Sequence, residues 1–518
     1  MSHESHTVQN NLAKTRIAPD LIARLFTRDG AEKPDSELHN VIIEMNSEFP
    51  GGGKAAQYDF INACRKDGKR VFGTLRDYRP PGQVKPFSIS LGGDENISAR
   101  KSLLTDGYVF ARLSRATILR IVALAPKVGE EAPFLVYKVW FDHRIERCVY
   151  TSVRTIKSDA ARAAFAAAGK SIVWAVADTG IDGTHPHFAT YATLNDLPAG
   201  VNHMDLTAEH PSDMQSAEAA LVDNSGHGTH VAGIIAGETK IDTEKLPGGI
   251  WISRTERQKD GTVTTTETEF HETISGIASL CKLVSLKVLK QSDDGQLSNL
   301  IAAINYVRRV NDYGRTVKIH GINLSLGYSF EPLWFAAGQS PLCNEVDLLV
   351  RAGVVVVAAA GNGGYGSVTT YSGTDEVATH LGTINDPGNS AMAITVGSTH
   401  REWPHNYGIS YFSGKGPTGD GRMKPDLVAP GERIVSCSIV KTPKEKGAYA
   451  AFQEDSGTSM AAPHVSGAAA AFMSVRTEFI GRPQQVKDIL MGSATDLKRQ
   501  REFQGAGLVD VMRALQAV

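Results

Sequence analysis

The sequence has little cysteine, no long apolar run and no surplus of either charge. Its five cysteines are scattered, odd in number and without CxxC spacing, so they fit reduced thiols better than a disulfide framework or a zinc site. The longest apolar candidate, 352–361, is about half of the roughly 18 residues that a membrane span requires, so we expect no membrane partner. The 54 basic and 56 acidic residues leave a net charge of −2, which argues against a nucleic-acid partner.

The first residues also lack the features of a secretory leader. The string MSHESHTVQNNLAKTR has no apolar core and no small-residue cleavage site, so no Sec signal peptide is visible. Together with the expected reduced cysteines, this favours a cytoplasmic location.

Apolar residues and glycine are abundant. Hydrophobic residues make up 42% of the chain, which supplies material for large cores. The 50 glycines among 518 residues exceed the average frequency of about 7%, which predicts many turns or close backbone approaches. At about 150 residues per domain the length allows three or four domains and leaves their number open.

From about residue 170 onward, near-continuous apolar runs alternate with helical patterns. Such runs are typical of parallel strands that are buried on both faces. Helical spacing over 298–313 and 343–352 separates successive runs. We therefore predict an α/β fold, with a doubly wound, mainly parallel sheet and helices on both faces. The expected strands are 172–177, 283–289, 319–326, 354–360 and 393–396.

Other regions differ from this α/β pattern. The polar residues 1–35 are expected to form a flexible N-terminal segment. Residues 36–146 mix strand-like and helix-like patterns, which predicts a smaller α+β domain. The remaining domain, 147–518, contains a surface insertion at 238–273, with a predicted hairpin around Lys259-Asp260-Gly261.

An aspartate and a histidine occur in contexts that would expose them for chemistry. Asp178 ends the first expected strand in AVADTGID, and the carboxyl ends of strands form the functional crevice of open α/β sheets. A carboxylate there can orient an imidazole, although an aspartate at a strand end is more often a turn or cap residue. His227 lies between glycines in DNSGHGTHVAGIIAG, and a neutral imidazole can take a proton from a hydroxyl and return it to a leaving amine. We expect His230 to be structural.

A serine and an asparagine complete the set of candidates. Ser459 lies in SGTSMAAPHVSG at the beginning of an expected helix, where the helix N-terminus suits a developing oxyanion. Its hydroxyl needs an adjacent base to become a nucleophile, and the simpler interpretation is a helix N-cap. Asn362 ends the apolar run VVVVAAAGNGG, where its amide could donate to the oxyanion together with the Ser459 N–H, or could simply form a turn.

Six strings together resemble the subtilisin-like serine proteases, the subtilase family, and within it the leaderless, intracellular-type members. The resemblance runs from about Val153 to Val518. It implies that Asp178 orients the imidazole and that His227 is the general base and acid. It also implies that Ser459 is the nucleophile and that Asn362 completes the oxyanion hole. In chain order, the strings are AVADTGIDGTHPHF, DNSGHGTHVAGIIAG, GINLSLG, VVVVAAAGNGG, YFSGKGPTGDGRMKPDLVAPG and SGTSMAAPHVSG.

The same resemblance implies a groove for an extended peptide. Ser325-Leu326-Gly327 matches the family segment that pairs with the substrate backbone, and Ala359-Ala360-Gly361 matches one wall of the specificity pocket. Such strand addition gives affinity through main-chain hydrogen bonds and leaves selectivity to side-chain pockets. Asp293 to Gln296 should lie on the opposite side of the substrate. The small wall residues indicate a roomy pocket and leave the preferred side chain open.

The chain departs from the family after the histidine helix. Many members have a short loop there that helps to bind calcium, whereas this chain has the insertion 238–273. No metal ligand is therefore predicted, no cofactor is required for the chemistry, and a structural calcium remains an open question. The insertion could be a flap, an exosite or decoration of the surface, and decoration is the simplest interpretation.

The N-terminal domain resembles the second half of the family's inhibitory propeptide. The runs GYVFARLSRATILRIVALAP and VYKVWFDHRIER carry this similarity. It implies that residues 36–146 are an intramolecular inhibitor and folding chaperone whose tail occupies the active site. Cleavage is then expected near Glu146 to Thr151. The alternative is a permanent adapter or regulatory domain.

These observations predict a serine endopeptidase made as a self-processing zymogen. It would hydrolyse peptide or protein substrates through an acyl-enzyme intermediate. One alternative is a proteolytically silent subtilase-fold binding module, which predicts at least one degraded catalytic position, whereas all four residues are present in this sequence. Another is an esterase, which would share the catalytic residues, but the segment Ser325 to Gly327 favours peptides.

Overall fold

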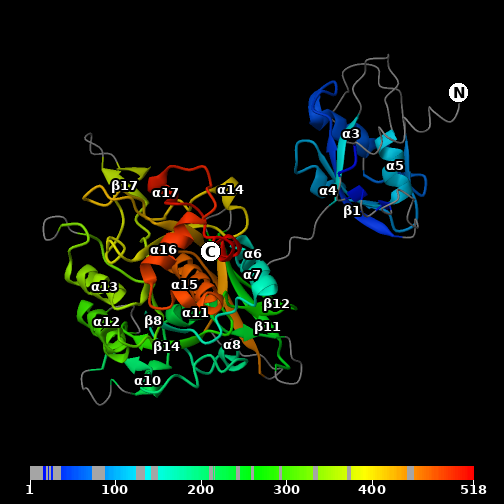
Figure 1. Cartoon of the computed structure of the whole chain (residues 1–518). Helices are drawn as coiled ribbons and strands as arrows, with labels where there is room; N and C mark the ends of the chain where they lie inside the picture. Colours follow the sequence, from blue (N-terminus) through cyan, green and yellow to red (C-terminus); the bar gives the residue numbers. More distant parts are fainter. Residues whose placement is uncertain are drawn as a thin grey trace. The chain divides into compact units, whose positions relative to one another are not determined.

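The computed structural model divides the chain into two compact units, 1–146 and 147–518 (Figure 1). Each unit has its own hydrophobic core. The structure describes residues 16–18, 21–22, 25–26, 37–72, 88–123, 135–141, 150–208, 214, 216–240, 246–257, 262–290, 295–330, 336–369, 375–439 and 448–518.

The first unit is an α+β structure around a four-stranded sheet. The strand order is β5-β6-β1-β7, and β1 pairs antiparallel with both β6 and β7. The helices α3 and α5 bury Phe60, Ile61, Ile118 and Ile121 in the core of this unit. A smaller sheet, β3-β2-β4, follows α3. The element bounds are β1 (Leu38–Met45), α3 (Gly52–Ala63), β2 (Cys64–Lys66), β3 (Lys69–Arg70), β4 (Ile89–Leu91), β5 (Asn96–Ile97), α4 (Ala99–Ser102), β6 (Tyr108–Ser114), α5 (Arg115–Ala123) and β7 (Val136–Phe141).

Part of the segment that we expected to be flexible is built into this unit. Ile17 forms a parallel bridge with Val139, and Leu21 and Leu25 are fully buried in the same core. Burial of these apolar side chains stabilises this part of an otherwise polar segment. The remaining positions of 1–35 lie outside the described residues.

The second unit contains a seven-stranded parallel sheet in the order β20-β19-β16-β15-β8-β14-β9, which confirms the predicted α/β fold. The strand β8 is first in sequence but lies inside the sheet, with β14 on one side and β15 on the other. The winding therefore reverses beside β8, and such a reversal opens a crevice at the carboxyl ends of the strands. The strands are β8 (Val173–Asp178), β9 (Met204–Asp205), β14 (Lys282–Lys287), β15 (Gly321–Leu324), β16 (Val355–Ala359), β19 (Ile394–His400) and β20 (Leu427–Glu432).

Helices cover both faces of this sheet because alternate residues of each strand enter different cores. In β8, Trp174 and Val176 join a core with the helices α11 and α15, whereas Ala175 and Ala177 join a core with α12 and α13. This explains why the strands are continuously apolar in the sequence. The helices of the unit are α6 (Tyr150–Thr155), α7 (Ser158–Phe165), α8 (Pro186–Ala189), α10 (Ala217–Ala220), α11 (His227–Ile235), α12 (Leu297–Val310), α13 (Pro341–Arg351), α14 (Pro404–Tyr407), α15 (Thr458–Val475), α16 (Pro483–Gly492), α17 (Arg501–Gln504) and α18 (Val511–Gln516).

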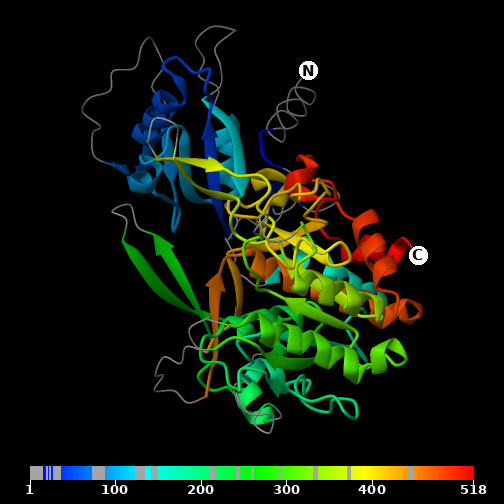
Figure 2. The same cartoon turned by 90° about the vertical axis from the view of Figure 1, so that its left-hand side faces the viewer.

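The insertion 238–273 forms the predicted hairpin and is also part of a second sheet (Figure 2). The hairpin strands are β11 (Ile250–Arg257) and β12 (Val263–Phe270), and β11 pairs in parallel with β22 (Ala450–Asp455). Ile250 and Ile252 are buried in the core, so the base of the insertion is structural and not only surface decoration. The turn residues 258–261 lie outside the described residues. The remaining strands are β10 (Glu238–Thr239), β13 (Ile274–Ser275), β17 (Tyr365–Thr369), β18 (Asp375–Thr379) and β21 (Ile434–Cys437).

Within the described part of the chain, no helix has both the length and the apolar character that crossing a membrane requires.

Candidate active site

The structure brings Asp178 and His227 together at the carboxyl end of β8. Asp178 is the last residue of β8 and His227 is the first residue of α11. The distance between His227 Nδ1 and Asp178 Oδ1 is 2.7 Å, and Asp178 is 1% exposed. The Thr179 N–H donates to the same carboxylate oxygen at 2.8 Å. A buried carboxylate beside Nδ1 holds the proton on that nitrogen, which leaves Nε2 as the basic one.

The glycine after the histidine is required by a close backbone approach. A Cβ on Gly228 would lie 2.1 Å from Gly180 O and 3.1 Å from Asp178 Cβ. Any larger residue would therefore push the first turn of α11 away from the end of β8. The small neighbours that the sequence showed around His227 thus have a physical cause.

A second carboxylate, Asp223, holds the beginning of α11. Its Oδ1 accepts hydrogen bonds from Thr179 Oγ1 at 2.9 Å and from the N–H groups of Ser225 and Gly226 at 3.1 and 2.8 Å. Its Oδ2 accepts from the N–H and the hydroxyl of Thr229 at 2.9 and 2.6 Å. Asp223 was not among the residues predicted from the sequence. The available signal was an aspartate placed just before a predicted helix, which is typical of a helix cap.

Ser459 lies where the sequence predicted it, at the N-terminus of a buried helix. It is the second residue of α15, whose first turns are buried. Its Oγ donates to Ser325 O at 3.0 Å, and Ser325 Oγ donates to Ser459 O at 2.8 Å. The first N–H groups of a helix have no partner within the helix and can bind an anion. In α15 the N–H groups of Thr458 and Met460 donate to Asn362 Oδ1 and Gly457 O, which leaves the Ser459 N–H for this purpose.

Asn362 is locked against the residue that precedes Ser459. Its Oδ1 accepts hydrogen bonds from the N–H and the hydroxyl of Thr458 at 2.9 and 3.0 Å. Because the amide oxygen is held in this way, the NH₂ group is left to donate elsewhere. The segment after β16 and the N-terminus of α15 are also joined by a bond from Gly361 N–H to Thr458 Oγ1 at 3.1 Å.

A cavity of about 480 Å³ adjoins these groups. Five of the six predicted substrate-binding residues line it, together with Asn362 and Ser459. The sixth, Ala360, is fully buried behind the wall, where its N–H donates to Val396 O and its carbonyl accepts from the Asn385 N–H. The lining residues are Ser325, Leu326, Gly327, Ser329, Ala359, Gly361, Asn362, Gly363, Asn385, Thr458 and Ser459.

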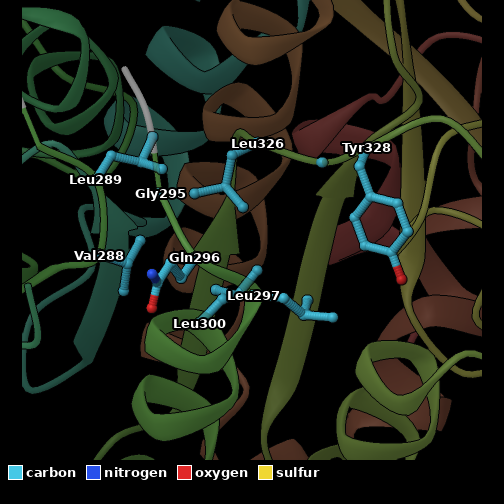
Figure 3. Close-up of a pocket in the computed structure, with 9 residues that line it drawn as sticks. Val288, Leu289, Gly295, Gln296, Leu297, Leu300, Leu326 and Tyr328 are labelled. Carbon is cyan, nitrogen blue, oxygen red and sulfur yellow. The ribbon is translucent and has the colours of Figure 1, made fainter. Parts of the chain in front are cut away.

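A second cavity of about 490 Å³ shares Leu326 and Gly327 with the first. Figure 3 shows Val288 and Leu289 at one end and Tyr328 at the other, with Leu300 and Leu326 between them. The lining is mostly apolar, so this cavity suits an apolar side chain. Of the segment expected opposite the substrate, Gln296 and Gly295 line this cavity, whereas Asp293 and Asp294 lie outside the described residues.

His230 and His464 are buried within helices. Burial lowers the pKa of His230 to about 4, and its Nε2 lies 3.1 Å from Gln453 O. Burial also lowers the pKa of His464 to about 4, and its Nδ1 lies 2.8 Å from Met460 O. Both imidazoles are therefore neutral near pH 7. This agrees with the structural role that we expected for His230.

An imidazole oriented by a buried carboxylate, and a serine at the N-terminus of a buried helix, are typical of serine hydrolase sites. A sequence profile of the subtilase family matches residues 169–508, and the chain belongs to that family.

Individual relatives agree with this family assignment. The chain is 34% identical to pyrolysin of Pyrococcus furiosus over 323 residues, which cover 56% of the chain and 21% of pyrolysin. It is 27% identical to the serine protease AprX of Bacillus subtilis over 356 residues, which cover 66% of the chain and 65% of AprX. It is 32% identical to the major intracellular serine protease of Bacillus subtilis over 318 residues, covering 61% of the chain and 72% of that protease. The matched regions thus span about a fifth of pyrolysin and about two thirds of AprX.

In the described part of the segment after α11, the carboxylate of Glu238 is occupied by protein partners and does not suit a calcium ion. Glu238 is 7% exposed and already faces two cations, with Arg162 at 3.9 Å and Lys240 at 3.2 Å, while Tyr191 donates to it at 2.9 Å. Arg162 also donates to Ser275 Oγ and Gly276 O, both at 2.8 Å. Among the residues that the structure describes, no group of three or more potential metal ligands is found.

Proposed function

We propose that this chain is a serine endopeptidase that uses Asp178, His227 and Ser459 as its catalytic residues. The observation that carries the proposal is the 2.7 Å contact of His227 Nδ1 with buried Asp178. His227 begins α11, which packs against α15, the helix that has Ser459 in its first turn. The membership of the subtilase family supports the same activity. Such chemistry needs no cofactor, because the side chains themselves supply base, acid and nucleophile.

In the proposed reaction, Ser459 Oγ leaves its bond with Ser325 O and attacks a substrate carbonyl carbon. His227 Nε2 takes the hydroxyl proton, and the negative carbonyl oxygen accepts from the Asn362 NH₂ and the Ser459 N–H. His227 then returns the proton to the leaving amine as the peptide C–N bond breaks, which leaves an acyl-serine. A water molecule then attacks the acyl carbon as His227 takes its proton. The bond to Ser459 Oγ breaks, His227 returns the proton to Oγ, and the acyl group leaves as a carboxylic acid.

The substrate is proposed to be an extended polypeptide. Ser325 to Gly327 lies along the 480 Å³ cavity, so its main chain would pair with the substrate backbone while a side chain enters the cavity. Gly327 is required here, because a Cβ would lie 2.4 Å from Asp386 O.

The N-terminal unit is proposed to be an intramolecular inhibitor that the enzyme removes itself. The separate core of 1–146 and the propeptide-like runs within it support this. Cleavage would fall near Glu146 to Thr151, of which 146–149 lie outside the described residues. The four described cysteines are free thiols, which supports a reducing, cytoplasmic location.

Activity is tested by labelling with a fluorophosphonate probe and by intact mass. Wild type and the control Ser474→Ala, whose hydroxyl bonds to Ala471 O in the same helix, should be labelled, whereas Ser459→Ala should not. A new N-terminus near residue 150 should form in wild type and be absent from purified Ser459→Ala. An unlabelled but folded wild type would favour the silent binding module. Labelling without a new N-terminus would leave the peptidase and refute self-processing.

A further inference from the structure

A buried lysine lies behind the wall of the cavity and has no part in the chemistry described above. Lys415 is 2% exposed. Its Nζ donates to three main-chain carbonyls, those of Gly364 at 2.9 Å, Tyr411 at 2.8 Å and Ser413 at 3.1 Å. An ammonium group has three donors, so this cage satisfies all of them.

These carbonyls belong to two segments that form the wall carrying Asn362. Gly364 is two residues after Asn362, and its N–H donates to Phe412 O at 2.9 Å. The Gly414 N–H donates to Gly361 O at 2.7 Å. A Cβ on Gly364 would lie 1.9 Å from Ser413 O and 2.4 Å from Lys415 Nζ, so the two segments are packed without spare room.

The same lysine is tied to a third segment of the cavity. Its N–H donates to Thr383 Oγ1 at 3.1 Å, and its carbonyl accepts from the Thr383 N–H at 2.8 Å. Two residues later, Asn385 lines the cavity. Lys415 therefore joins three stretches of chain that are far apart in sequence and meet at one wall.

The charge of Lys415 is balanced by carbonyl dipoles. Among the described residues, no carboxylate forms an ion pair with it, and burial lowers its pKa to about 8. The titratable groups on the elements packed around it are Tyr365 of β17, Tyr411 of the bonded loop, His380 after β18, and Glu502 of α17, whose carbonyl accepts from the Gly416 N–H. The ring of Phe503 lies 5.4 Å from Nζ.

We propose that Lys415 is a positioning residue that fixes the Asn362 wall and thereby sets selectivity for the substrate side chain in the cavity. The proposal rests on the peptidase function above. Without the ammonium, three buried carbonyls lose their donor, and unsatisfied buried groups force the chain around them to shift. Binding of a large substrate side chain depends on contacts along the whole wall, whereas the methyl group of an alanine substrate does not reach the wall.

The test compares Lys415→Met with Lys487→Met on two peptides that differ only in Phe or Ala on the acyl side of the scissile bond. Lys487 is the control, because it is also buried and donates to Ala391 O at 3.1 Å and Ala393 O at 2.8 Å on a different part of the sheet. Unlike Lys415, it also pairs with Asp426 at 3.0 Å. Lys415→Met should lower the Phe-to-Ala ratio of kcat/KM by about tenfold, as expected when one or two buried methylene contacts are lost. Lys487→Met should lower Tm and leave the ratio unchanged.

A second measurement does not depend on the folding of Lys415→Met. In wild type the Phe-to-Ala ratio of kcat/KM should fall between pH 7 and pH 9.5. The reason is that the neutral amine of Lys415 has only two donors for three carbonyls. In Lys415→Arg, which stays charged, the ratio should hold constant over the same range.

An unchanged ratio in Lys415→Met, or an equal change in Lys487→Met, would overturn the proposal. Should Lys415→Met not fold, a ratio that is constant with pH in wild type would overturn it. Fluorophosphonate labelling separates this proposal from the peptidase function, because Lys415→Met should still be labelled at Ser459. If wild type is not labelled, the peptidase function itself fails.

Discussion

Replacement of Asp223 by alanine tests how the candidate active site is held together. Asp223 is 6% exposed, and its carboxylate accepts five hydrogen bonds from the beginning of α11 and from Thr179. Thr179 Oγ1 in turn accepts from the Gly228 N–H at 2.9 Å. The residues next to Asp178 and next to His227 are thus linked through one carboxylate.

The expected magnitude follows from the donors that would lose their partner. Two of the five are hydroxyls that can turn to other acceptors, whereas three are main-chain N–H groups that cannot. Two of these N–H groups, those of Gly226 and Thr229, are buried. At about 1–3 kcal/mol for each unsatisfied buried donor, Asp223→Ala should lower the free energy of unfolding by at least about 2 kcal/mol. That is a large part of the roughly 5–15 kcal/mol of a typical domain. A shift of His227 by about 1 Å should reduce kcat/KM by about 10²-fold.

Asp223→Asn is the informative companion variant. It keeps one oxygen for Thr179, Ser225 and Gly226, but its NH₂ would face the Thr229 N–H, so we expect a smaller loss of about 1–2 kcal/mol. Unfolding in urea is measured in the Ser459→Ala background, which removes autolysis, and kcat/KM is measured in the active background. The control is Asp196→Ala, whose side chain is 84% exposed. If Asp223→Ala changed stability and kcat/KM no more than this control, the positioning argument would be wrong.

Three further perturbations have defined outcomes. Gly228→Ala should fold poorly or lose most activity, measured as residual kcat/KM and Tm, because its Cβ would lie 2.1 Å from Gly180 O. The lowered pKa of His464, about 4 against 6.5, means that the unfolded state binds more protons in this window, so stability falls as pH falls from 6.5 to 4. His464→Gln should reduce that fall by about 2 kcal/mol, measured by urea unfolding at pH 7 and 4.5. Arg162→Ala should lower Tm, whereas Glu238→Gln should not alter any effect of EDTA on Tm, because Glu238 already faces two cations. A drop in Tm with EDTA that Glu238→Gln abolishes would refute the poor fit of Glu238 for calcium.

Local pattern was enough to predict the sheet and the positions of its reactive ends. The runs around Val176 and Val357 are apolar at every position because these strands are buried on both faces. That pattern ends abruptly at Asp178 and shortly before Asn362, where the chain leaves the sheet. The sequence therefore predicts which residues lie at the ends of the buried strands, even without knowledge of which strands are neighbours.

The sequence by itself determined the α/β class, the family and the residues proposed for the chemistry, because each lies in a short string with its own local constraint. The tertiary structure alone decided what holds those residues. The bond of Asp223 with Thr179, the carbonyl cage of Lys415 and the pairing of β11 with β22 join segments that are far apart in sequence, which no local pattern records. The full burial of Ala360 likewise follows from its bonds with Val396 and Asn385. Hydrogen bonds and close packing between distant segments depend on where the chain folds back, and only the folded chain contains that information.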